Sequence, residues 1–81
     1  MTTPKKKHLI ELMIEVGVNW PDGAEYAAQD KDSWLAFYTR KPYMESWKVT
    51  WSSDGGYVSN SLKKLDLLCR NWHQTIVTRA Q

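Results

Sequence analysis

The sequence predicts an α+β fold in which a three- to four-stranded antiparallel sheet carries an N-terminal and a C-terminal helix on one face. Apolar residues recur with helical spacing between residues 5 and 16 and again between residues 62 and 78. Between these segments lie aromatic and alternating runs that are typical of strands, separated by turns that contain Pro and Gly. This order of elements favours two layers, with both helices over the same side of the sheet.

The composition is that of one small globular domain spanning residues 1–81, with frayed ends at residues 1–4 and 79–81. A hydrophobic content of 42% and a charged content of 25% argue against disorder. The net charge of +2 is lower than the charge that nucleic-acid-binding domains usually concentrate. No run approaches the length of a membrane span, so we expect no membrane association. The single cysteine, Cys69, favours a reducing cytoplasm.

The first helix is expected at Lys5–Val16. Thr3 is the expected N-cap, Pro4 the first helical residue, and Gly17 the left-handed residue that ends the helix. The apolar stripe of this helix comprises Leu9, Ile10, Leu12, Met13 and Val16.

A β-hairpin is expected to organise the rest of the chain. Its two strands are Ala24–Gln29 and Ser33–Arg40, joined at the polar triplet Asp30-Lys31-Asp32. In the second strand, Leu35 and Phe37 share the face that we expect to meet the helices. The opposite face carries Trp34, Ala36 and Tyr38.

Two shorter strands and the second helix are expected after the hairpin. Trp47–Trp51 alternates apolar and polar residues, as a half-buried strand does. A turn at Asp54-Gly55 is expected to set Val58 opposite Trp51, with Tyr57–Ser59 as a short final strand. Leu62–Thr78 is expected to be a helix that follows a cluster of capping residues. Its apolar stripe comprises Leu62, Leu65, Leu68, Cys69, Trp72 and Ile76.

No catalytic constellation is evident, so we expect no enzyme, no cofactor and no small-molecule substrate. Asp30–Ser33 begins like an EF-hand loop, but it lacks the glycine at position six and the acidic residue at position twelve. Turn formation explains its carboxylates. Cys69 and His73 would face the same way on a helix, but a zinc site needs further ligands. We therefore expect a buried thiol beside a partly exposed imidazole, and no metal.

The excess of aromatic residues is the main functional signal. Five Trp, four Tyr and one Phe in 81 residues are many for one small core, and Trp, Tyr and Arg are enriched at interface hot spots. Because two helices on one face cover only one side of the sheet, we expect the other side to bind a partner protein or a second copy of the chain. The expected partner-binding residues are Trp34, Tyr38, Tyr26 and Arg40.

Nucleic-acid binding is the alternative function. Basic residues on a helix face would contact phosphates, and aromatic rings between them would stack on bases. Ordinary solvated lysines explain the same pattern, and we favour that interpretation. The residues of this alternative are Lys63, Lys64, Arg70 and Lys41.

The segment Trp20-Pro21-Asp22-Gly23-Ala24, followed by Ala28-Gln29-Asp30-Lys31-Asp32, resembles a segment of small proteins from tailed bacteriophages and prophages. In those proteins a Trp-Pro-x-Gly-Ala turn leads to an Ala-x-Gln-Asp-x-Asp hairpin and an aromatic strand. This sequence departs from the pattern at Ser33, where such proteins often carry Gly. The resemblance implies a phage or prophage origin rather than a mechanism. Because small phage proteins of this kind are often accessory factors, we expect a non-enzymatic protein that binds a host or phage protein in the bacterial cytoplasm and modulates or inhibits it.

Overall fold

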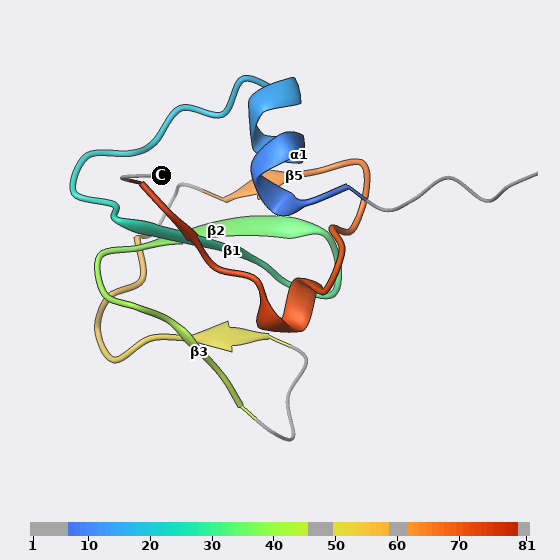
Figure 1. Cartoon of the computed structure of the whole chain (residues 1–81). Helices are drawn as coiled ribbons and strands as arrows, with labels where there is room; N and C mark the ends of the chain where they lie inside the picture. Colours follow the sequence, from blue (N-terminus) through green and yellow to red (C-terminus); the bar gives the residue numbers. More distant parts are fainter. Residues whose placement is uncertain (1–6, 46–49, 59–61, 80–81) are drawn as a thin grey trace, which may run out of the picture.

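An antiparallel four-stranded sheet forms the middle layer of the molecule (Figure 1). The structure is a computed structural model that describes residues 7–45, 50–58 and 62–79. The described elements are, in chain order, α1 (Leu9–Glu15), β1 (Tyr26–Gln29), β2 (Trp34–Tyr38), β3 (Tyr43–Met44), β4 (Trp51–Ser52), β5 (Lys63–Lys64), the 3-10 turn η1 (Trp72–Gln74) and β6 (Val77–Thr78). The strand order in the main sheet is β5-β2-β1-β6, and β3 pairs with β4 in a separate two-stranded sheet.

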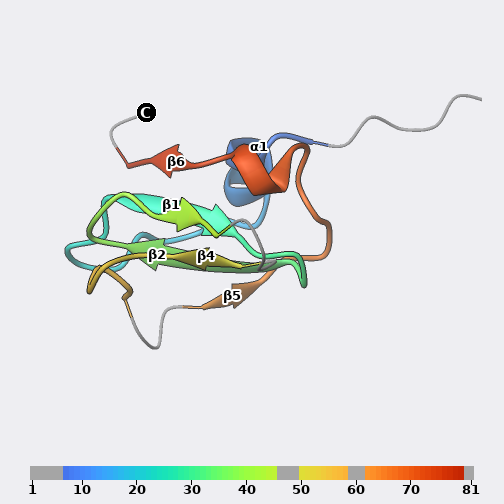
Figure 2. The same cartoon turned by 90° about the horizontal axis from the view of Figure 1, so that it is seen from below.

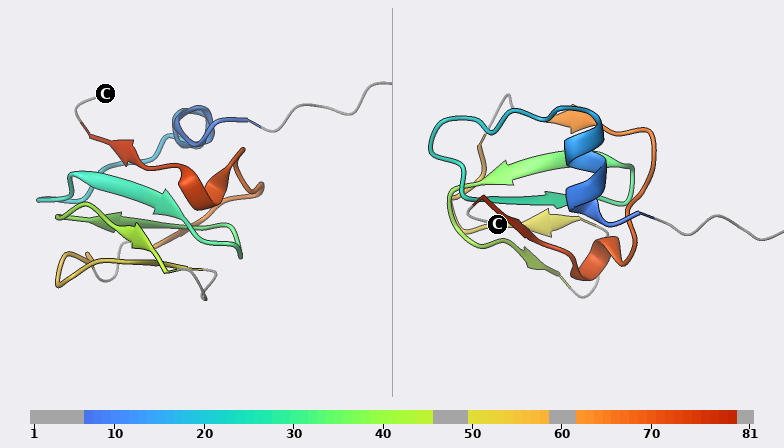
Figure 3. Two further views of the ribbon diagram at one scale, coloured as in Figure 1. Left: turned by 60° about the horizontal axis from the view of Figure 1, so that its bottom comes forward. Right: turned by 45° about the horizontal axis from the view of Figure 1, so that its top comes forward.

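The predicted pair of helices on one face of the sheet is wrong. Helix α1 lies over one face of the four-stranded sheet, and the β3-β4 hairpin lies over the other (Figures 1 and 3). Among the described residues α1 is the one α-helix, and the C-terminal segment forms strands and a 3-10 turn instead. The fold is therefore mostly β and antiparallel, with three layers where two were expected.

Residues 62–78, predicted to be a helix, instead supply both edges of the four-stranded sheet (Figure 2). Strand β5 pairs with the start of β2, and β6 pairs with β1. Backbone groups of this segment therefore form hydrogen bonds with the sheet, whereas in a helix they would bond to each other. The Leu65 N–H, for example, donates to the Ser33 carbonyl at 3.0 Å. Asn71 has a left-handed backbone with φ of 50°, which a helix does not allow.

Gln29, at the end of β1, is fully buried and holds residues 67–69 in a non-helical path. Its Nε2 donates to the Leu67 carbonyl at 2.8 Å and to the Ser33 carbonyl at 3.2 Å. Its Oε1 accepts from the Cys69 N–H at 2.7 Å. A helix would use the Leu67 carbonyl and the Cys69 amide for its own bonds, so these contacts oppose helix formation.

The predicted central hairpin is confirmed. Strands β1 and β2 are antiparallel, with Ala28 opposite Ala36 in the middle of the register. The Asp30 carbonyl accepts from the Ser33 N–H, and the Asp30 N–H donates to the Trp34 carbonyl, both at 2.9 Å. Ser33 has φ of 74°, so the loop of residues 31–33, closed by the Asp30–Trp34 hydrogen bond, ends in a left-handed residue. A glycine would suit this position better than serine does.

Helix α1 starts later than predicted and ends as predicted. His8 precedes it with an extended backbone, and the Glu11 carboxylate accepts from the His8 N–H at 3.3 Å. An acidic residue in the first turn complements the helix dipole, which lysines there would not. Gly17, with φ of 67°, is left-handed directly after the helix. The expected cap Thr3 and first helical residue Pro4 lie outside the described residues.

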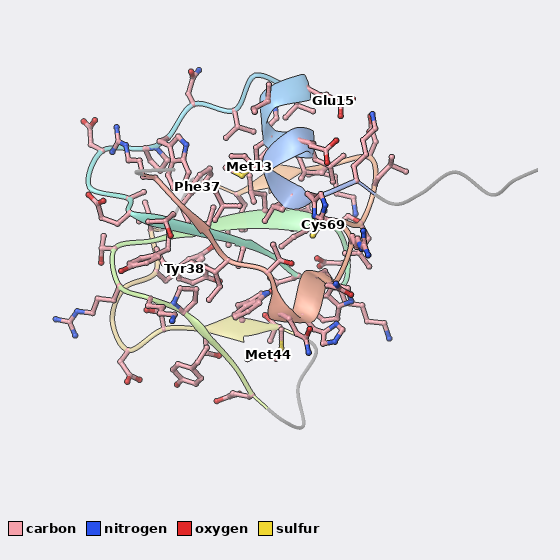
Figure 4. The ribbon with its side chains drawn as sticks, viewed as in Figure 1. Met13, Glu15, Phe37, Tyr38, Met44 and Cys69 are labelled. Atoms are coloured by element: carbon pink, nitrogen blue, oxygen red, sulfur yellow. The ribbon has the colours of Figure 1, made fainter. Side chains whose placement is uncertain are left out.

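The face of β2 that was expected to meet the helix does so. Leu35 and Phe37 are buried under α1, and Figure 4 shows Phe37 and Met13 on the helix side of the sheet. The buried residues of this core are Leu9, Leu12, Met13, Ala24, Ala27, Leu35, Phe37, Leu65, Cys69 and Val77.

The pairing expected for Trp51 is wrong. Trp51 lies opposite Met44 in the β3-β4 hairpin, whereas the Val58 N–H donates to the Phe37 carbonyl at 2.9 Å. Val58 packs on the helix side of the sheet and Trp51 on the other side, so the two residues belong to different layers. Residues 46–49, most of the strand predicted before Trp51, lie outside the described residues.

Candidate binding cleft

The β3-β4 hairpin covers much of the sheet face that was expected to stay open. Tyr38 is only 2% exposed, so the prediction that this ring lies on an open face is wrong. It belongs to a second buried core with Ala28, Ala36 and Trp51. Trp34, at the other end of β2, is 38% exposed. Along β2, the exposed part of this face is therefore at Trp34.

The four predicted partner-binding residues do not form one surface. Trp34 and Tyr38 line the same cleft. Tyr26 lies opposite Tyr38 across the β1-β2 pair, where it packs half-buried on the second core. Arg40 is exposed beyond the end of β2, and its guanidinium donates to the Asp54 carbonyl at 3.2 Å. Sequence reasoning thus located two of the cleft residues and missed the rest.

The cleft lies between the β1-β2 turn, the outer face of β2 and the start of β4, and has a volume of about 390 Å³. The polar part of its lining consists of Asp30, Asp32 and Thr50. The aromatic and apolar part consists of Trp34, Tyr38, Trp51, Tyr57 and Leu62. A cleft of this size, mostly aromatic with a few placed polar groups, has the composition of a ligand-binding site.

Asp30 is positioned by the turn and by β4. Its Oδ1 accepts from the Trp51 N–H at 2.9 Å and from the Thr50 hydroxyl at 3.0 Å. Burial raises the pKa of Asp30, these two hydrogen bonds lower it in part, and the nearby carboxylate of Asp32 adds to the rise. Among the described residues no hydrogen bond reaches the second oxygen of Asp30, and no cationic nitrogen lies within ion-pair distance of either carboxylate. The cleft therefore contains a partly desolvated acid with one acceptor oxygen still available.

Tyr38 contributes a phenol that stays protonated. Burial raises its pKa, and the charge of Asp30 and the Tyr57 hydroxyl raise it further. The Tyr38 and Tyr57 rings are in contact, with centroids 5.9 Å apart, and a β-bridge joins the two residues. No described residue is hydrogen-bonded to the Tyr38 hydroxyl, which is therefore free to bind a ligand in the cleft.

Trp34 already carries one cation at the rim of the cleft. The Lys64 ammonium lies 5.8 Å from the centroid of the indole ring, within the range of a cation–π contact. The same ammonium donates to the Asp32 carbonyl. Asp32 in turn accepts from the Trp34 N–H through its Oδ1 at 3.2 Å, as a turn carboxylate does. The predicted role of these carboxylates in the turn is confirmed.

The basic residues of the nucleic-acid alternative are not on one helix face, because that helix does not exist. Lys63 and Lys64 are neighbours in β5, so their side chains leave the strand on opposite sides. The Arg70 N–H donates to the Lys7 carbonyl, which places Arg70 beside the start of α1. Lys41 follows β2, whereas β5 pairs with the beginning of that strand. Of these four residues, only Lys63 and Lys64 are neighbours, and they are neighbours in sequence.

Cys69 and His73 also lose the helical spacing that would align them. Cys69 is buried in the helix-side core, and His73 is exposed on η1 with its ring against Trp72, at a centroid distance of 5.7 Å. Within residues 7–45, 50–58 and 62–79, no group of three or more His, Cys, Asp or Glu residues could hold a metal ion. In the same ranges no helix has the length and apolar character needed to cross a membrane.

Comparisons of the chain with protein-family models, curated proteins and solved structures give no match. The resemblance to phage proteins therefore stays a prediction.

Proposed function

We propose that this chain is a non-enzymatic protein-binding module whose partner docks over the cleft at the Trp34 end of the sheet. The observation that carries the proposal is the set of exposed apolar side chains around that cleft. Trp34 is 38% exposed, and Tyr57 and Leu62 are each 47% exposed. Clustered apolar side chains around a cleft are typical of protein interaction sites, and Trp and Tyr are enriched among the residues that dominate binding energy.

The resemblance to phage and prophage proteins adds the class of partner. It supports a host or phage protein in the bacterial cytoplasm, which this module would modulate or inhibit by occupying a surface. A second copy of the chain is the other protein partner that the same cleft would serve. The separation of the Lys63-Lys64 pair from Arg70 and from Lys41 favours protein over nucleic acid as the partner.

The test uses a double variant, Trp34→Ser with Tyr57→Ser. Both rings are exposed enough that the fold should survive their loss, which thermal unfolding will verify. Ile14→Ser is the matched control, because Ile14 is a large apolar residue, 71% exposed, on α1 at the opposite face of the sheet. Affinity capture from a bacterial lysate with mass spectrometry, and sedimentation for self-association, are measured for all three proteins.

A partner retained by the wild type and by Ile14→Ser, and lost from the double variant, supports the proposal. Equal retention by all three proteins, or no retention and no self-association in the wild type, overturns it. A gel shift with DNA or RNA at physiological salt that Lys63→Glu with Lys64→Glu abolishes would favour the nucleic-acid alternative instead.

A further inference from the structure

We propose that the cleft binds an arginine side chain, with its guanidinium placed between the Asp30 carboxylate and the aromatic rings. This inference rests on the proposed function and names the group of the partner that the cleft recognises. Two independent features of the cleft support it. One is a carboxylate with an unused oxygen, and the other is the Tyr38 hydroxyl, which has no hydrogen-bond partner among the described residues, beside the exposed rings of Trp34 and Tyr57.

The charge of the cleft selects a cation. Asp30 is half-buried, and its two hydrogen bonds come from neutral donors, the Thr50 hydroxyl and the Trp51 amide. An anionic ligand would be repelled by Asp30 and Asp32. An apolar ligand would remove the remaining water from Asp30 without replacing its hydrogen bonds, which costs free energy. A cation offsets that cost, and a close opposite charge favours the ionised carboxylate.

The rings select a flat, weakly hydrated cation over a compact one. A guanidinium stacks on aromatic faces and donates in a planar fork to a carboxylate, whereas an ammonium is strongly hydrated and acts as a point charge. Trp34 and Tyr57 supply exposed ring surface, and Trp34 already holds the Lys64 ammonium at its rim. Lys64 is not part of the lining of the cleft, so the position beside Asp30 is open to a second cation.

The remaining lining fits the rest of an arginine. The Tyr38 hydroxyl has lone pairs that can accept one guanidinium N–H. Leu62 is an apolar surface for the three-carbon stem, which buries well along such residues. A volume of about 390 Å³ accommodates the whole side chain and leaves room for the backbone of a partner to approach.

The experiment measures binding of N-acetyl-arginine amide by NMR titration of backbone amides and by tryptophan fluorescence. N-acetyl-citrulline amide is the neutral ligand of the same shape, and N-acetyl-lysine amide is the ammonium ligand. We expect the arginine amide to shift the signals of residues at the cleft with an affinity near the millimolar range, and the citrulline amide to bind at least about tenfold more weakly. Lysine amide should lie between the two.

Asp30→Asn is the decisive variant, because an amide oxygen can still accept from Thr50 and Trp51 while the charge is gone. It should weaken arginine amide binding by at least about tenfold. Asp22→Asn is the matched control, since Asp22 is an exposed turn carboxylate that precedes β1, whereas Asp30 follows that strand, and it should bind as the wild type does.

Equal binding of arginine and citrulline amides, stronger binding of lysine amide, an unchanged affinity in Asp30→Asn, or no shift at about ten millimolar ligand would each overturn this inference. These outcomes leave the proposed function standing if Trp34→Ser with Tyr57→Ser still loses its captured partner. Conversely, arginine binding with no loss of capture in that double variant would contradict the proposed function and not the ligand chemistry.

Discussion

Replacing Gln29 should test how the C-terminal segment is held against the sheet. Gln29 is fully buried and makes three side-chain hydrogen bonds, two as donor and one as acceptor, to Ser33, Leu67 and Cys69. Each bond contributes roughly 0.5–1.5 kcal/mol net, and a buried group left without a partner costs roughly 1–3 kcal/mol. Gln29→Ala should therefore destabilise the fold by about 3–5 kcal/mol, which is much of the total stability expected for a domain of this size.

Two further substitutions at Gln29 separate volume from hydrogen bonding. Gln29→Met keeps the length of the side chain and loses all three hydrogen bonds. It should therefore be more stable than Gln29→Ala only by the part of the free energy that the cavity costs. Gln29→Glu keeps the acceptor for Cys69 but turns a second oxygen toward two carbonyls. At neutral pH the glutamate is buried and charged, and its second oxygen has no donor, so this variant should be the least stable of the three.

The Gln29→Glu variant also predicts a sign for the pH dependence. Burial and the facing carbonyls raise the pKa of the introduced carboxyl in the folded state above its unfolded value of about 4.3. Stability relative to wild type is therefore greatest below that unfolded value and is lost as pH rises through the folded pKa. Urea denaturation followed by tryptophan fluorescence at about pH 4 and pH 7 measures the difference at each pH. If the gap between this variant and wild type is the same at both values, Gln29 does not donate to buried carbonyls as described.

Four other substitutions probe the turns and the cleft. Ser33→Gly should stabilise the fold by about 1 kcal/mol, because φ of 74° strains a residue with a side chain, and a lower melting temperature would contradict this account of the turn. Gly56→Ala should cost about 1–3 kcal/mol, since its Cβ would lie 2.9 Å from the Arg40 backbone nitrogen. Gly55→Ala, in open space with φ of 72°, should cost about 1 kcal/mol, so equal melting temperatures for the two glycine variants would argue against close packing at Gly56. Asp30→Asn should be at least as stable as wild type at neutral pH, because burial raises the pKa of Asp30 in the folded state. Any gain in stability over wild type should vanish as pH falls below the unfolded pKa of 3.8. Chemical denaturation of both proteins at several pH values measures this difference.

The central hairpin could be predicted from the sequence because local signals agree with its tertiary environment. Residues of β2 alternate between two buried faces, and the triplet before Ser33 carries the turn-forming carboxylates. The end of α1 was likewise encoded locally, in Gly17 and its left-handed backbone. In these places propensity, pattern and packing lead to the same structure.

The C-terminal segment could not be predicted in this way because distant residues determine its conformation. Its apolar spacing fits a helix, yet Leu65 and Cys69 reach the same core from an extended path. The partners that decide between the two conformations are the free edge of β2 and the side chain of Gln29, some 40 positions away in the sequence. A polar residue in a strand gives no indication of which carbonyl it will bind, so tertiary contacts override the local helical pattern.

The cleft was missed for a related reason. Trp34 and Tyr38 were recognised as one face of a strand, but the layer that buries Tyr38 consists of strands of only two residues each. Such short strands carry too few residues for a periodic pattern to be detected. Asp30 was interpreted as a turn residue, and the structure shows that it is one. Its second role, accepting hydrogen bonds from Thr50 and Trp51 at the start of β4, depends on residues distant in the sequence.

The end of β1 joins all the layers that form the cleft. The backbone carbonyl of Gln29 accepts from the Trp51 indole at 3.1 Å, and the next residue, Asp30, accepts from the Trp51 amide at 2.9 Å. The side chain of Gln29 meanwhile holds the segment of Cys69 beside the opposite face. The sheet, the β3-β4 hairpin and the C-terminal segment are thus tied together within two residues, next to the open rings of Trp34 and Tyr57. Substitutions at Gln29 should therefore remove stability and binding together, whereas substitutions at the open rings should remove binding alone, because those rings lie outside this junction.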